Sequence, residues 1–109
     1  EDSGDLLVLG WGGTYGAIRE AVIRAQKVGI NVSHVQVRFL NTLPPDLGAV
    51  IKRFNNILIP ELNLGQFRKL VRAEFLIEPL KLNKVKGKPF RADEIYNEIE
   101  MILRKNNND

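Results

Sequence analysis

A carboxylate and two amides stand where a predicted strand passes into a predicted helix. The apolar run at residues 57–59 is short enough to be a buried strand, and apolar residues recur at helical spacing from 67 to 75. In open parallel α/β sheets, ligands and partners usually dock at this carboxyl edge. The candidate interface or binding residues are therefore Glu61, Asn63, Gly65 and Gln66.

The same residues also have a purely structural interpretation. Asn63 and Gln66 have the N-cap and N3 spacing of a capping box, with Asn in place of Ser or Thr. An Asn cap stabilises a helix by roughly 0.5–2 kcal/mol relative to Ala, so the residues alone favour this structural role. Glu61 is expected to be partly buried and therefore needs a partner. That partner could be an amide of the turn before Gln66, the side chain of Arg38 on the neighbouring strand, or a group in another domain.

A glycine-rich turn follows the first apolar run and precedes a predicted helix. Backbone amides at a helix N-terminus bind anions readily, so this turn is a candidate anion loop. A dinucleotide fingerprint fails, because Tyr15 stands where the third glycine is required and Arg38 where an acid is expected. The remaining interpretation, which we favour, is a tight turn that lets the helix and strand pack closely. The loop residues are Gly12, Gly13, Thr14 and Gly16.

A single histidine and a basic run are the other polar candidates. His34 is the only histidine, and no residue with triad or metal spacing accompanies it, which favours a polar residue on a strand face. The basic run could meet an acidic partner or a phosphate-bearing cofactor such as coenzyme A. A solvated edge strand explains it more simply, since lysine there discourages aggregation. The run comprises Lys81, Lys84, Lys86, Lys88 and Arg91.

Composition excludes several classes of protein. A chain of 109 residues suits one domain with a real core. The absence of cysteine excludes disulfides, iron–sulfur clusters and thiolate zinc sites within this chain. No apolar run approaches the roughly 18 residues that a membrane span requires. A net charge of +3 is too small to argue for a nucleic-acid partner.

The order of the predicted elements indicates an α/β fold. Strands expected at 6–9, 31–39, 57–61 and 76–85 alternate with helices expected at 18–28, 47–54, 67–75 and 95–103. Gly29 and Ile30 are the expected glycine stop and hydrophobic contact at the end of the first helix. The alternation predicts a three-layer αβα domain with a mostly parallel sheet, whose last strand lies near an edge. We expect a linker at 1–5, one domain at 6–104 and a disordered tail at 105–109.

Three segments together resemble one enzyme family. They run from Pro60 to Gln66, from Leu70 to Leu76 and from Leu82 to Phe90. In this order they are similar to the C-terminal part of the alpha subunit of 2-oxoacid:ferredoxin oxidoreductases, and most similar to the 2-oxoglutarate type. The resemblance implies a domain like the C-terminal domain of transketolase. The polar start at Glu1 is what we expect of a domain from a longer polypeptide.

The resemblance implies that the chemistry lies elsewhere in the parent enzyme. That enzyme would oxidatively decarboxylate a 2-oxoacid to an acyl-coenzyme A and reduce ferredoxin, using thiamine diphosphate, Mg, an iron–sulfur cluster and coenzyme A. This chain lacks the G-D-G…N-N segment that binds thiamine diphosphate, and it lacks cysteine. It would therefore be a non-catalytic assembly domain that binds no cofactor or metal itself.

The resemblance also implies partners and a location. The partners would be the other domains of the subunit and the beta subunit, with ferredoxin reached through the holoenzyme, in the cytoplasm. Neither nucleic acid nor a membrane would be a partner. A place in a multidomain subunit favours a partner for Glu61 in another domain.

Two alternatives stay open. The first keeps the fold and changes the enzyme, to a C-terminal domain of a transketolase or of a branched-chain dehydrogenase beta chain. The segment at residues 83–90 argues against it. The second is a free-standing flavodoxin-like module that binds a nucleotide or an anion through the glycine loop.

Overall fold

The computed structural model describes residues 4–37, 46–61, 66–83 and 90–107, and the side chains of all of these except 66, 81–83 and 105–107. Strands and helices alternate, as the sequence predicts. Their order is β1 (Gly4–Trp11), η1 (Gly12–Thr14), α1 (Tyr15–Lys27), β2 (Val32–Val37), α2 (Leu47–Ile51), β3 (Phe54–Glu61), α3 (Gln66–Phe75), β4 (Leu80–Asn83) and α4 (Ala92–Asn107).

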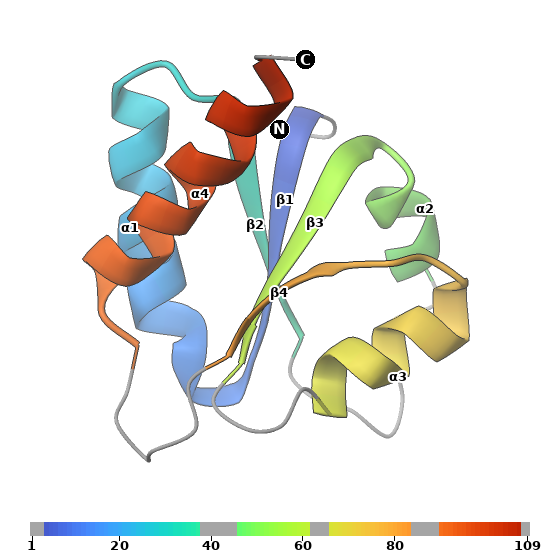
Figure 1. The fold of residues 1–109 in the computed structure, drawn as a ribbon. Coiled ribbons are helices and arrows are strands. Elements are labelled where there is room, and N and C mark those ends of the chain that lie inside the picture. The colour runs from blue at the N-terminus through green and yellow to red at the C-terminus, as the bar shows by residue number, and fades with distance from the viewer. Residues whose placement is uncertain (1–3, 38–45, 62–65, 84–89, 108–109) are drawn as a thin grey trace.

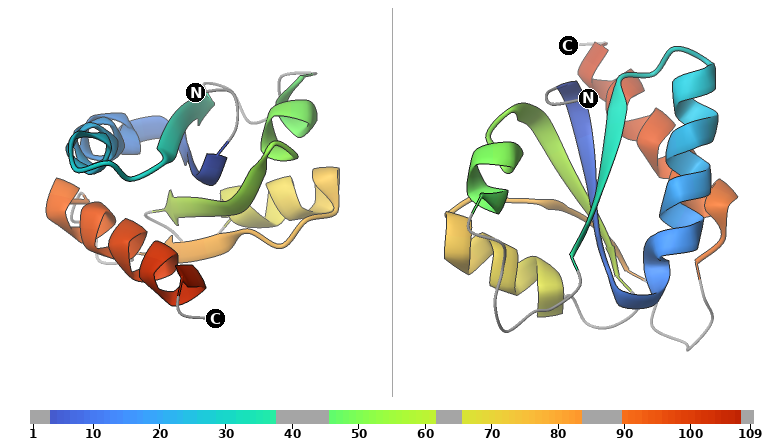
Figure 2. Two further views of the ribbon diagram at one scale, coloured as in Figure 1. Left: turned by 90° about the horizontal axis from the view of Figure 1, so that it is seen from above. Right: turned by 180° about the vertical axis from the view of Figure 1, so that it is seen from behind.

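The four strands form one parallel sheet in the order β2-β1-β3-β4. Helices α1 and α4 cover one face of this sheet, and α2 and α3 cover the other (Figure 1, Figure 2). The predicted three-layer αβα domain with a parallel sheet is confirmed. β4 lies at one edge of the described sheet, as predicted, and β2 lies at the other edge.

The central strand explains why the first apolar run is continuous. A strand between two helical layers is buried on both faces and therefore needs apolar side chains at every position. Leu6 and Val8 pack into the core beneath α1 and α4. Leu7 and Leu9 pack into the core beneath α2 and α3. All four of these side chains are fully buried.

Helix α1 ends as its sequence predicts. Gly29 adopts a positive φ of 87°, which a glycine accepts without steric cost. Its amide donates to the carbonyl of Gln26, and the amide of Ile30 donates to the carbonyl of Ala25, both at 3.0 Å. This pair of bonds is a Schellman motif, and Ile30 packs against the core as the expected hydrophobic contact.

Strand β3 begins earlier than the sequence indicates. The predicted helix at 47–54 ends at Ile51, and Phe54 begins the strand. The predicted end of the helix at 54 is wrong, because pairing with β1 extends the strand, with Phe54 opposite Gly4 and Asn56 opposite Leu6. The partner that lengthens β3 lies about fifty residues away in the sequence, so no local pattern reveals it.

Other elements also differ in length from their predictions. β1 begins at Gly4, within the expected linker, because the Gly4 amide donates to the carbonyl of Arg53. Helix α4 continues to Asn107, into the expected tail. β4 (residues 80–83) begins later than the predicted strand at 76–85, whose last two residues lie outside the described part of the chain. In the part of the chain that the structure describes, no helix has the length and apolar character needed to cross a membrane.

Candidate functional site

Glu61, at the carboxyl end of β3, is the buried acid of the predicted site. Only 5% of this residue is exposed. One carboxylate oxygen accepts a bond from the amide of Phe67 at 2.6 Å, and the other accepts a bond from the amide of Arg68 at 3.0 Å. Both amides belong to the first turn of α3, where backbone donors have no intrahelical acceptor. The side chain of Glu61 therefore caps α3 across the strand–helix connection.

This geometry corrects the expected partner of Glu61. The sequence offered the turn before Gln66, Arg38 or another domain, and the resemblance favoured the last. The structure places the partners just after Gln66, within the chain. Asn63, Gly65 and Arg38 lie outside the described residues, as does the side chain of Gln66, so the capping box stays a prediction.

The glycine turn lies at the same edge of the sheet, after β1. Trp11, the last residue of β1, packs against Phe67 at the start of α3, with ring centroids 6.4 Å apart. Gly12 follows with a positive φ of 67°. The hydroxyl of Thr14 donates to the carbonyl of Trp11 at 3.1 Å, so this side chain holds the turn together.

The close approach of helix and strand is at Gly10, the first glycine of the glycine-rich turn. A Cβ at Gly13 or Gly16 would meet nothing within 4 Å, so neither residue is needed for tight packing. At Gly10 a Cβ would lie 2.5 Å from Cδ1 of Ile18 and closer still to Oε1 of Gln36. The open space next to Gly13 and Gly16 leaves room for a ligand. Anion binding by this loop stays a prediction.

His34 lies on the edge strand β2 and belongs to a small polar network. Its Nε2 is 2.9 Å from Oε1 of Gln36, and Nε2 of Gln36 donates to the carbonyl of Gly12 at 3.1 Å. The carbonyl of Gly12 can only accept a hydrogen bond, so the side-chain amide of Gln36 directs its NH₂ group at Gly12 and its oxygen at His34. That oxygen also only accepts, so Nε2 of His34 carries the proton. Burial lowers the pKa of His34 below 6.5, the Gln36 hydrogen bond opposes this shift, and the Arg19 guanidinium lowers the pKa further.

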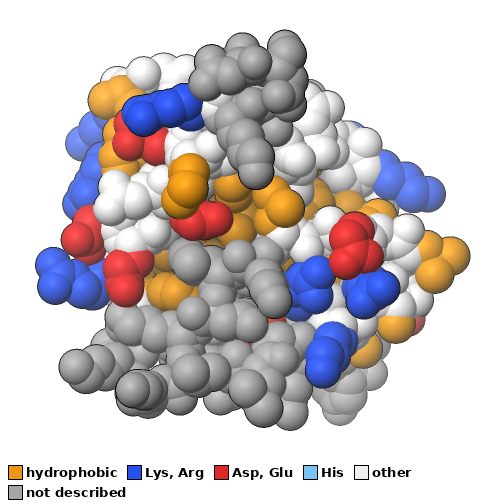
Figure 3. Space-filling view, viewed as in Figure 1, with side chains coloured by type: hydrophobic (Ala, Val, Ile, Leu, Met, Phe, Trp, Pro, Cys, Tyr) orange, Lys and Arg blue, Asp and Glu red, His pale blue; other side chains and the backbone are white. Residues whose placement is uncertain are grey.

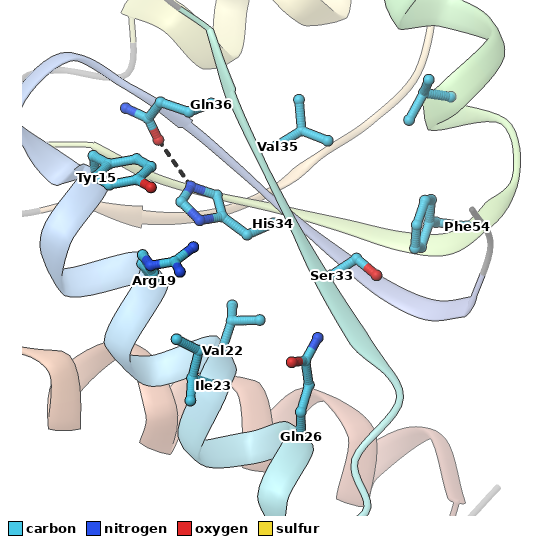
Figure 4. Close-up of a pocket in the computed structure, with 11 residues that line it drawn as sticks. Tyr15, Arg19, Val22, Ile23, Gln26, Ser33, His34, Val35, Gln36 and Phe54 are labelled. Atoms are coloured by element: carbon cyan, nitrogen blue, oxygen red, sulfur yellow. Dashed lines mark hydrogen bonds between the residues drawn. The ribbon is translucent and has the colours of Figure 1, made fainter. Parts of the chain in front are cut away.

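A cavity of about 320 Å³ opens beside this network. Figure 4 shows Tyr15, Arg19 and Gln36 around the imidazole of His34, while Ser33 and Val35 point to the other side of the strand, toward Phe54. The Tyr15 ring lies 5.4 Å from the His34 ring, centroid to centroid. Arg19 is not among the site residues predicted from the sequence. The sequence feature that points to Arg19 is its four-residue spacing from Tyr15, which places both side chains on one helical face.

The basic run lies largely outside the described residues. Of its five members, only Arg91 has a described side chain, and its Nε lies 3.2 Å from Oδ1 of Asp93. On the face drawn in Figure 3, acidic side chains lie beside the basic ones. Among the described residues, no group of three or more His, Cys, Asp or Glu is placed to hold a metal ion.

Comparisons with known proteins agree on one enzyme family. The chain is 45% identical over 99 residues to 2-oxoglutarate oxidoreductase subunit KorA of Mycobacterium tuberculosis, covering 91% of the chain and 15% of the relative. It is 29% identical over 110 residues to 2-oxoacid:ferredoxin oxidoreductase 1, subunit alpha, of Aeropyrum pernix, covering 95% of the chain and 17% of the relative. No protein-family model matches the chain.

A solved structure shares the fold. It is a 2-oxoglutarate:ferredoxin oxidoreductase from Magnetococcus marinus with 2-oxoglutarate, coenzyme A and succinyl-CoA bound. The TM-score is 0.87 at 30% sequence identity, and the match covers 93% of this chain and 18% of that one. The chain thus spans less than a fifth of the length of each protein it matches, and it is homologous to one segment of them.

Proposed function

We infer that the chain is one domain of the alpha subunit of a 2-oxoglutarate:ferredoxin oxidoreductase, and that it lies in the C-terminal part of that subunit. The homology to subunit KorA carries this inference, because 45% identity extends over 91% of the chain. The holoenzyme would convert 2-oxoglutarate to succinyl-coenzyme A and reduce ferredoxin.

The domain's role in this enzyme is assembly rather than chemistry. A ferredoxin-reducing enzyme transfers electrons through iron–sulfur clusters, whose usual ligand is cysteine, and the chain has none. Glu61, the buried acid at the carboxyl edge, has both oxygens bonded to helix amides. Its carboxylate therefore organises the fold. Thiamine diphosphate, Mg, the cluster and most contacts to coenzyme A would belong to other domains and to the beta subunit.

The relatives favour this enzyme over the alternatives that keep the fold. Both sequence relatives are named as subunits of 2-oxoacid or 2-oxoglutarate oxidoreductases, and neither is a transketolase or a branched-chain dehydrogenase. A free-standing flavodoxin-like module would need a ligand at the glycine turn. The hydroxyl of Thr14 in this turn donates to the carbonyl of Trp11, which indicates a structural role for that side chain.

A domain exchange tests the proposal. The segment of Mycobacterium tuberculosis KorA that matches this chain is replaced by residues 4–107, and the chimeric subunit is produced together with its partner subunit. Because the domain supports assembly, we expect the two subunits to co-purify and to retain 2-oxoglutarate-dependent ferredoxin reduction. An unrelated αβα domain of similar size, inserted at the same place, is the control and should abolish co-purification. A chimera that fails in the same way as this control would contradict the proposal.

A further inference from the structure

The cavity beside His34 has a basic lining in the part of the chain that the structure describes. From α1, the side chains of Tyr15, Arg19 and Gln26 face it, and from β2 those of His34 and Gln36. On the other side of the strand, the lining residues Val35, Val50 and Phe54 are apolar, and Ser33 contributes a hydroxyl. Among the described residues that line this cavity, none is acidic.

Arg19 has no counter-charge among the described residues. The neighbouring acid Glu20 pairs instead with Arg24, at 3.6 Å and with i,i+4 spacing. Figure 4 shows the guanidinium of Arg19 turned toward the ring of His34. A guanidinium that faces a cavity without a carboxylate presents a fork of donors suited to a carboxylate or phosphate group.

The hydrogen bonds of His34 complement this charge. Its Nε2–H donates to Gln36, so in the neutral ring Nδ1 carries a free lone pair. Protonation of Nδ1 would turn the ring into a second cationic donor. An anion in the cavity would supply the charge that makes this protonation favourable.

We propose that this cavity binds a small oxyanion, the carboxylate or phosphate group of a small molecule, through the Arg19 guanidinium, the Tyr15 hydroxyl and a protonated His34. Arg19 supplies a fixed positive charge, Tyr15 supplies a neutral hydrogen-bond donor, and His34 becomes charged when the anion binds. The volume of about 320 Å³ lies at the lower end of the range of ligand pockets, which suits a small group. This site does not depend on the proposed enzyme function.

The proposal predicts how binding depends on pH. In the free protein, burial holds the pKa of His34 below 6.5. The bound anion favours the imidazolium and raises that pKa, so the complex takes up protons between the two pKa values. Affinity should therefore weaken as the pH rises through this window and strengthen as it falls.

The single histidine makes the measurement direct. The ring proton signals of His34 are the only histidine signals of the chain, so its pKa is read from an NMR pH titration without mutagenesis. The titration is run in sodium chloride, in sodium sulfate and in sodium acetate at equal ionic strength. Sulfate keeps its charge over the relevant pH range and represents a phosphate group, and acetate represents a carboxylate. We expect sulfate or acetate to raise the pKa of His34 by about one pH unit, the lower end of the effect of a nearby opposite charge.

Two charge-matched variants decide the outcome. Arg19→Gln should abolish the rise, because it removes the fixed charge. Lys27→Gln removes the same charge from an exposed site on α1 and should leave the rise intact. Tyr15→Phe keeps the ring and should weaken binding several-fold. A rise in the pKa of His34 in either salt supports the proposal. A larger rise in sulfate indicates a phosphate ligand, and a larger rise in acetate indicates a carboxylate ligand. An equal pKa in all three salts, or a rise that persists in Arg19→Gln, would overturn it.

Discussion

Glu61 joins the end of β3 to the start of α3 through its side chain. A carboxylate at the carboxyl end of a central strand, only 5% exposed, is unfavourable unless it is bonded. Its two oxygens accept the amides of Phe67 and Arg68, which also places a negative charge at the N-terminus of α3, where the helix dipole favours it. Glu61 thus belongs to the folding of this domain, whatever covers the edge of the sheet.

We therefore expect Glu61→Gln to lower the free energy of unfolding of the 109-residue chain by about 1.5–3 kcal/mol, the range for hydrogen bonds to a charged group. Glutamine keeps one acceptor but turns an NH₂ toward a helix amide. Urea melts measure the change, and Glu74→Gln on the exposed side of α3 is the control. Equal midpoints for wild type and Glu61→Gln would mean that the two bonds do not stabilise the fold.

The backbone just after the C-terminus of α3 is strained. Leu76 follows the helix with a positive φ of 56°, and 88% of the residue is exposed. Left-handed backbone costs an L-residue roughly 1–2 kcal/mol, and this side chain buries almost nothing in return. The segment is held by Glu78, whose carboxylate lies 3.0 Å from both Arg68 and Arg72.

Leu76→Gly should therefore stabilise the chain by about 0.5–1 kcal/mol, because glycine adopts this backbone without steric cost and is the usual residue at such a helix end. The gain is smaller than the strain, since glycine loses more backbone entropy on folding. Ala73→Gly, on the exposed face of the same helix, is the control and should destabilise by a similar amount. Thermal or urea melts compare them. A destabilised Leu76→Gly would show that the leucine makes contacts worth more than the strain.

At the scale of the whole molecule, the parallel sheet brings the ends of its strands to one edge. The turn after β1 and the capping contact after β3 meet there through Trp11 and Phe67. The polar groups nearest to this contact already have partners, with Thr14 bonded to the backbone of Trp11 and Glu61 to the first turn of α3.

We expect neither thiamine diphosphate with Mg²⁺ nor NAD nor FAD to raise the melting temperature of the 109-residue chain. The chain lacks the diphosphate-binding segment, and Tyr15 replaces the third glycine of the dinucleotide fingerprint. Thermal-shift titrations measure this, with an intact 2-oxoglutarate:ferredoxin oxidoreductase as the positive control for thiamine diphosphate. A rise of several degrees with thiamine diphosphate would contradict the assembly role, and a rise with NAD or FAD would contradict the interpretation of the glycine turn.

The sequence by itself determined those features that depend on local patterns. The continuous apolar run of β1, the alternation of strands and helices and the glycine stop at Gly29 all follow from the environment of each residue and its near neighbours. The resemblance to one oxidoreductase family also came from the order of segments along the chain. The homology to subunit KorA supports that resemblance over most of the chain.

Only the tertiary structure decided the features that depend on distant pairs. β3 begins at Phe54 because β1 pairs with it there. Arg19 and His34 line one cavity because α1 packs beside β2. Glu61 finds its partners where the connection from β3 brings α3 back to the strand end. Each of these contacts depends on how the helices pack against the strands, which the local sequence pattern does not determine.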